Sequence, residues 1–222
     1  KARDALLQYY KQLSEYSGKR LDADDFFPVQ GEEMIRVVLQ WQLEEVADVG
    51  WTVCHDRVRG RCDYDNKKIL IAVDAVSGPG ERNFTIAHEI GHAVLHGHMV
   101  GLGGALNRTK SAGRRPLPEL RSTGQRIERE ANIFATELLM PEKSVRDRFE
   151  RIFGRPALWL GSSQIRSKLV GVRAMPEPEL EQVAAFIAEY KAEHETRSLV
   201  GSFGVSRSAM ALRLRELGLL YS

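Results

Sequence analysis

The chain has 222 residues, of which 43% are hydrophobic and 28% are charged, and its formal net charge is +2. These values are typical of a folded globular protein and argue against a disordered, fibrous or membrane protein. The small net charge also argues against a polyanionic partner for the molecule as a whole. Because the chain has neither an apolar run of about 18 residues nor a basic-then-apolar leader, we expect no membrane span and no signal peptide. Its two cysteines, Cys54 and Cys62, form no CxxC pair, which favours a reducing cytoplasm.

The first half of the chain predicts two helices followed by short strands. Apolar residues at helical spacing predict helices over residues 2–16 and 31–47, with a turn around Pro28 between them. Residues 51–54 and 68–73 are rich in β-branched and apolar residues and are bounded by turn-forming residues, which predicts strands.

A third helix and a long loop are predicted next. Asn83 or Thr85 can cap the start of this helix, and Gly97 is suited to end it. Residues 101–127 contain six Lys or Arg against one Glu and show no sustained periodicity. We therefore expect a mobile basic loop there, beside the end of the third helix.

The remainder of the chain is predicted to be helical. One helix is expected over residues 125–139, because Pro141 prevents its continuation. Two further helices are expected over residues 142–153 and 177–195, and a last helical element over residues 199–220.

The segment His88-Glu89-Ile90-Gly91-His92 in the third helix is an HExxH motif. Residues i and i+4 of a helix lie one turn apart, so His88 and His92 can bind one Zn²⁺ ion. Glu89 between them can take a proton from the attacking water and deliver it to the leaving amine. A chance match is the alternative, but burying these groups in so apolar a helix is costly without a metal.

A catalytic zinc site needs a third protein ligand, and three residues are candidates. His98 has the spacing of the metzincin third ligand, but Leu95 replaces the Gly that turns the chain out of the helix. On the next helix, Glu128 falls on the apolar face and Glu130 on the polar face. Because a carboxylate in an apolar stripe is costly unless a cation meets it, Glu128 is preferred, with His98 and Glu130 as alternatives.

Two more polar side chains lie near the predicted ligands. His96 is one turn beyond His92, and we favour a structural or supporting role for it over a fourth ligand, because histidines at helix ends often cap carbonyls. Asn132 follows Glu128 by one turn. It would orient that carboxylate through a hydrogen bond, or else be a neutral surface residue.

Two linked motifs carry a family resemblance. Residues 83–96 read NFTIAHEIGHAVLH, and residues 128–141 read EREANIFATELLMP. Together they closely resemble the ImmA/IrrE family of bacterial and phage metallopeptidases, whose second motif reads ExxANxFAxxLLMP. The first Glu of that motif is the family's third metal ligand, and Glu128 stands at this position. More weakly, the resemblance extends over about residues 28–220.

The resemblance implies a cytoplasmic peptidase that uses Zn²⁺, or Mn²⁺ in the cell, and cleaves a helix-turn-helix repressor to derepress stress-response or mobile-element genes. The fold expected is α+β: mostly helical and zincin-like, with a small β-sheet and a C-terminal helical region. We expect the metallopeptidase domain over residues 1–160 and the C-terminal helical, helix-turn-helix-like region over residues 161–222. Two departures from the family are the long basic segment at 101–127 and the long separation at 154–195.

The last segment, residues 199–220, has the pattern of a helix-turn-helix unit in which Ser206 caps the second helix. Arg207, Arg213 and Arg215 would then contact DNA phosphates or base edges. We favour the alternative, an amphipathic helix packed on the core with its arginines in water, because no extended basic stripe is present. The rival function is a DNA-binding or toxin–antitoxin-type regulator with a metal site but little turnover, and the intact HExxH motif speaks against it.

Overall fold

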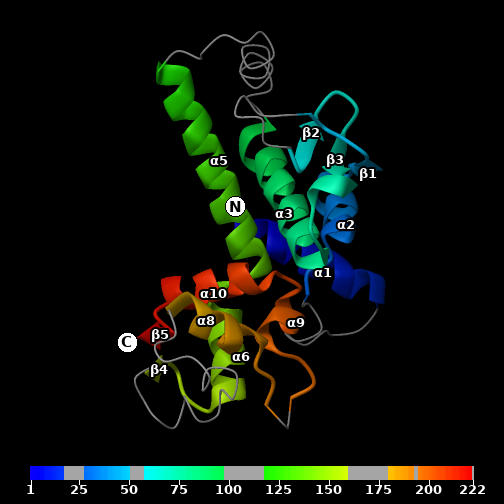
Figure 1. The fold of residues 1–222 in the computed structure, drawn as a ribbon. Coiled ribbons are helices and arrows are strands. Elements are labelled where there is room, and N and C mark those ends of the chain that lie inside the picture. The colour runs from blue at the N-terminus through cyan, green and yellow to red at the C-terminus, as the bar shows by residue number, and fades with distance from the viewer. Residues whose placement is uncertain (18–27, 51–57, 98–117, 160–179, 193–194, 222) are drawn as a thin grey trace. The chain divides into compact units, whose positions relative to one another are not determined.

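The computed structural model describes residues 1–17, 28–50, 58–97, 118–159, 180–192 and 195–221 (Figure 1). The main division of the chain into two compact units falls between Leu138 and Leu139, and each unit is described by itself. The domain boundary predicted between residues 160 and 161 stays a prediction, because residues 160–179 lie outside the described part. Within the described residues, no helix combines the length and the apolar character needed to cross a bilayer.

The first unit combines helices with one small mixed sheet. Its elements are α1 (Ala2–Ser17), α2 (Gly31–Met34), a π-helical turn (Ile35–Leu39), β1 (Gln42–Val46), β2 (Gly60–Asp63), β3 (Lys68–Ala72), a 3-10 turn (Val73–Ala75), α3 (Pro79–His96) and α5 (Pro118–Leu139). The mostly helical α+β fold predicted from the sequence is thereby confirmed.

The sheet has the strand order β1-β3-β2, with β1 parallel and β2 antiparallel to the central strand β3. In β3, Ile69, Ile71 and Ala72 are buried, as expected for a strand covered on both faces. The predicted strand at 68–73 is therefore confirmed, and the one predicted at 51–54 lies outside the described residues. Residues 60–63 show no apolar alternation, yet they form β2 through their pairing with β3.

The helix predicted over residues 31–47 is wrong in its second half. The helical part ends at Leu39, and Gln40 takes a left-handed conformation with a φ of 56°. The chain then forms β1, in which Leu43 lies beside Ile69 of β3. Pairing with a distant strand overrides the local helical spacing of apolar residues.

Helix α3 begins earlier than its predicted caps. Pro79 stands in the first turn, where a missing N–H costs no hydrogen bond. Instead of capping the helix, Thr85 lies within it, and its hydroxyl donates to the carbonyl of Glu81 at 2.9 Å. The helix ends at His96, followed by Gly97 as predicted.

Helix α5 is longer than the predicted 125–139, because it starts at Pro118. The C-terminal part of the predicted basic loop is therefore helical, while residues 101–117 lie outside the described part. Within the first unit, α3 lies between the sheet and α5 (Figure 1). This arrangement gives α3 one face against β2 and β3 and another against α5.

The second unit is a helical cluster with a two-stranded parallel sheet. Its elements are α6 (Glu142–Phe153), β4 (Leu158–Trp159), α8 (Leu180–Glu189), α9 (Leu199–Phe203), α10 (Arg207–Glu216) and β5 (Leu220–Tyr221). The predicted helix at 142–153 is confirmed, whereas the one predicted at 177–195 ends at Glu189. Between α9 and α10, Gly204 adopts a left-handed φ of 62°, and Ser206 caps α10 by accepting from the amide of Ala209.

Of the three arginines of α10, Arg207 and Arg215 are exposed, as both interpretations predicted, whereas Arg213 is not. Arg213 is only 6% exposed, and its Nε–H donates to the carbonyl of Met140 at 3.1 Å. Arg207 is exposed but donates to Glu189 at 2.9 Å. The expectation that Arg213 contacts DNA or faces water is therefore wrong, because its guanidinium satisfies a main-chain carbonyl within the same unit.

Replacing Arg213 with Ala is expected to lower the free energy of unfolding by about 1.5–3 kcal/mol, because a charge-assisted hydrogen bond is lost and the carbonyl of Met140 loses this donor. Arg215→Ala, an exposed position on the same helix, is the control and should change stability by no more than about 0.5 kcal/mol. Denaturant unfolding of both variants measures the difference. Equal effects would contradict a structural role for Arg213.

Candidate metal centre

His88 and His92 lie one turn apart on α3, as the HExxH spacing predicts. Their Nε2 atoms are 3.0 Å apart and their ring centroids 4.6 Å apart. The two side chains are mostly buried, with exposed fractions of 17% and 14%. Two imidazole nitrogens that converge in this way favour a shared cation between them.

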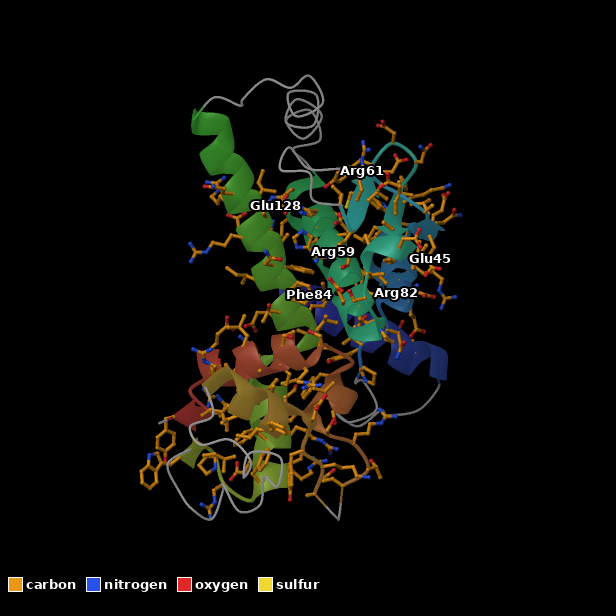
Figure 2. All side chains as sticks on the ribbon, viewed as in Figure 1. Glu45, Arg59, Arg61, Arg82, Phe84 and Glu128 are labelled. Atoms are coloured by element: carbon orange, nitrogen blue, oxygen red, sulfur yellow. The ribbon has the colours of Figure 1, made fainter. Side chains whose placement is uncertain are left out.

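Glu128 lies on α5 (Figure 2). Its carboxylate contacts both of these histidines. Its Oε2 atom lies 3.3 Å from Nε2 of His88 and 3.6 Å from Nε2 of His92. The three candidate ligand atoms all lie within 4.8 Å of one another. Helices α3 and α5 together therefore supply two imidazoles and one carboxylate to one point.

The close approach of α5 to α3 depends on Gly91. A Cβ atom at this position would lie 3.2 Å from the Cα and carbonyl oxygen of Ala131 and 3.2 Å from Cβ of Phe134. These separations are tighter than most contacts of real Cβ atoms. The glycine inside HExxH thus lets the second helix come near enough for Glu128 to reach the histidines.

Of the two alternative third ligands, Glu130 is not part of this group. Glu130 lies to one side of the cluster, with its Oε2 atom 3.6 Å from Nε2 of His96. His98 lies outside the described residues. The side chain of Glu128 is 58% exposed. The prediction that Glu128 lies in a buried apolar stripe is therefore wrong, and its approach to His88 and His92 is what distinguishes it from Glu130.

Asn132, predicted either to orient Glu128 or to be a neutral surface residue, contacts a histidine. Its Oδ1 atom lies 2.9 Å from Nδ1 of His88. As an acceptor, this oxygen favours a proton on Nδ1 and leaves the lone pair of Nε2 directed toward His92 and Glu128. Asn132 is thus placed to fix both the ring orientation and the tautomer of His88.

Glu89 faces the sheet side of α3 and is only 6% exposed. The thiol of Cys62 on β2 donates to the main-chain carbonyl of Glu89 at 3.1 Å. Burial raises the pKa of the Glu89 carboxyl, against the opposing effect of nearby His92 and His88. A carboxylate with a raised pKa is a better proton acceptor, as a general base requires.

The charges of the cluster suit a cation. Hydrogen bonds from His88 and His92 hold the pKa of Glu128 well below its usual range. Burial opposes protonation of His88, but the hydrogen bond to Glu128 and the negative charge of Glu89 raise its pKa on balance. Two imidazoles and one carboxylate are the donor set of a three-ligand catalytic zinc site, so the residues present fit a divalent metal ion.

The sequence did not predict the part of the site contributed by β2. Cys62 contacts Glu89, and Gly60 lies against the same residue. Tyr64, just after the strand, packs edge-on against Trp41 with ring centroids 5.5 Å apart. A four-residue segment without apolar periodicity gave no signal that it would pair with β3 beside α3.

Comparisons with known proteins agree with the two-motif resemblance. Residues 55–155 match the IrrE N-terminal-like domain, the Peptidase_M78 family. The chain is 31% identical over 94 residues to "Uncharacterized immunity region protein 2" of Bacillus phage phi105, an alignment that spans 42% of this chain and 51% of the relative. A solved "Mycobacterium tuberculosis transcriptional regulator" is similar with a TM-score of 0.39 and 19% identity, over 67% of this chain and 47% of that one. This chain thus spans about half the length of each relative, and its residues 55–155 are similar to the IrrE N-terminal-like domain of the Peptidase_M78 family.

Proposed function

We propose that this protein is a zinc-dependent endopeptidase in which His88, His92 and Glu128 hold the metal and Glu89 is the general base. The observation that carries the proposal is the convergence of the three ligand atoms within 4.8 Å, from two separate helices, inside the segment that matches the peptidase family. Mn²⁺ is the alternative metal, because it accepts the same imidazole and carboxylate donors.

The chemistry divides between the metal and this chain's own residues. A bound divalent ion would supply a Lewis acid and lower the pKa of water. Glu89 takes one proton from the attacking water and returns it to the nitrogen of the leaving amine, so that the peptide bond is broken with no net change in protonation of the enzyme. Asn132 keeps the Nε2 atom of His88 directed at the metal.

For the substrate, we propose a helix-turn-helix repressor in the cytoplasm. The resemblance to ImmA/IrrE peptidases and the similarity to a phage immunity region protein support this class. The test is to sequence the genes beside this one and to incubate any small helix-turn-helix repressor found there with the purified protein and Zn²⁺ or Mn²⁺. Cleavage that needs the metal and is absent in Glu89→Gln is expected, and intact repressors in every mixture would contradict the substrate class.

Removing the oxygen of Asn132 is expected to weaken metal binding. Asn132→Leu should lower zinc affinity by about 10–100-fold, because the imidazole of His88 loses the acceptor that orients it. Asn132→Asp retains an acceptor and should bind zinc with affinity close to that of the wild type. Competition with a chromophoric chelator measures both affinities, and equal loss in the two variants would contradict the role of this contact.

A further inference from the structure

We propose that Gly60 of β2 is a positioning residue for Glu89. Because glycine has no side chain, position 60 leaves the space in which the carboxylate of the base lies. The inference rests on the proposed function, since it concerns the proposed base of that reaction. It assigns to β2 a part in catalysis that neither of the two family motifs contains.

The contact between Gly60 and Glu89 leaves no room for a methyl group. A Cβ atom at position 60 would lie 2.9 Å from both Cγ and Oε1 of Glu89, and 2.8 Å from Cγ2 of Thr85. Real Cβ atoms essentially never approach other atoms closer than 3.0 Å. Gly60 is not among the glycines with a positive φ, so space alone, and not backbone conformation, requires a glycine here.

The surroundings of this contact decide which atoms would yield to a larger residue. Thr85 is buried, and its hydroxyl is bonded to the carbonyl of Glu81 at 2.9 Å, which fixes its rotamer. The strand is held as well, because Gly60 is paired with Ile71 of β3. In contrast, the carboxylate of Glu89 is the far end of a flexible side chain, so it is the group that moves.

Further bonds at the two ends of the strand hold β2 to β3 and to α3. At one end, the carbonyl of Arg59 accepts from the amide of Ala72 at 2.9 Å, and its guanidinium lies 2.6 Å from Glu81. At the other end, the thiol of Cys62 donates to the carbonyl of Glu89. The strand therefore contacts both the main chain and the side chain of Glu89. Movement of β2 away from α3 would break these bonds.

The experiment compares Gly60→Ala with Gly78→Ala in the zinc-loaded full chain. A Cβ atom at Gly78 would meet nothing within 4 Å, which makes this variant a matched control. Cleavage is measured on fluorescein-labelled casein and on any repressor that the test of the proposed function finds to be cleaved. Gly60→Ala should lose about 10²-fold in kcat with little change in KM, because a misplacement of about 1 Å costs that much. Zinc stoichiometry should be unchanged in both variants.

Crystal structures of the wild type and of Gly60→Ala test the displacement directly. We expect the Glu89 carboxylate to have moved away from position 60, while His88, His92 and Glu128 superpose. An unmoved Glu89 with a displaced β2 would overturn the inference. If the wild-type protein cleaves neither probe, that result counts against the proposed function. The position of Glu89 in the two structures would still show whether Gly60 positions this side chain.

A second variant covers the case in which Gly60→Ala does not fold. Adding Thr85→Ser removes the Cγ2 atom that the new methyl meets at 2.8 Å, but retains the hydroxyl and both contacts with Glu89. The double variant should fold and still show the low kcat. Wild-type kcat in the double variant would mean that the contact with Thr85, rather than with Glu89, matters, and would overturn the inference.

Discussion

Replacing Glu89 with Gln is expected to reduce cleavage by about 10²–10⁴-fold, the usual contribution of a general base. The amide retains the shape of the side chain in its buried position but cannot accept the proton of the attacking water. Metal content should stay at one ion per chain, because Glu89 is not among the three converging ligand atoms.

Glu130→Gln is the matched control for this variant. It makes the same chemical change on α5, at a side chain that lies near His96 rather than in the ligand cluster, so its cleavage rate should equal that of the wild type. Rates on the cleaved repressor and metal analysis of each protein give the comparison. Cleavage that survives in Glu89→Gln would remove Glu89 from the role of base.

Replacing His92 with Ala is expected to lower zinc affinity by more than about 100-fold. Loss of a hydrogen-bond partner of a metal ligand already costs about 10–100-fold, and loss of a ligand itself should cost more. One of the three converging donors is then lost, and the remaining pair, His88 and Glu128, cannot complete a tetrahedral site without extra water. Cleavage should fall with the metal.

Thermal stability offers a readout of this loss that is independent of cleavage. Zinc at about 1,000 times its Kd stabilises a protein by about 4 kcal/mol, so the wild type should melt at a higher temperature with zinc than with a chelator. His92→Ala should show little such difference. His96→Gln, a change at the next histidine on the same helix face, should retain it. Equal zinc stabilisation of His92→Ala and the wild type would contradict the assignment of this ligand.

Much of the local structure followed from the sequence. The spacing of His88 and His92 sets them one turn apart on any α-helix, so their convergence needed no tertiary information. The bounds of α6 were also predictable, because Pro141 precedes it and Gly154 ends it in a left-handed conformation with a φ of 69°. In each case the signal lies within a few residues of the structure that it determines.

The tertiary structure alone decided the parts of the fold and the site that join distant segments. Residues 42–46 have helical spacing of apolar residues but form β1, because β3 offers them a strand to pair with. Asn132 stands one turn from Glu128, yet it bonds to His88 across the two helices. Gly60 meets Glu89 only because pairing with β3 brings β2 against α3. Local periodicity reports which face of an element is apolar, whereas the partner of each face depends on long-range packing, which no short window of sequence contains.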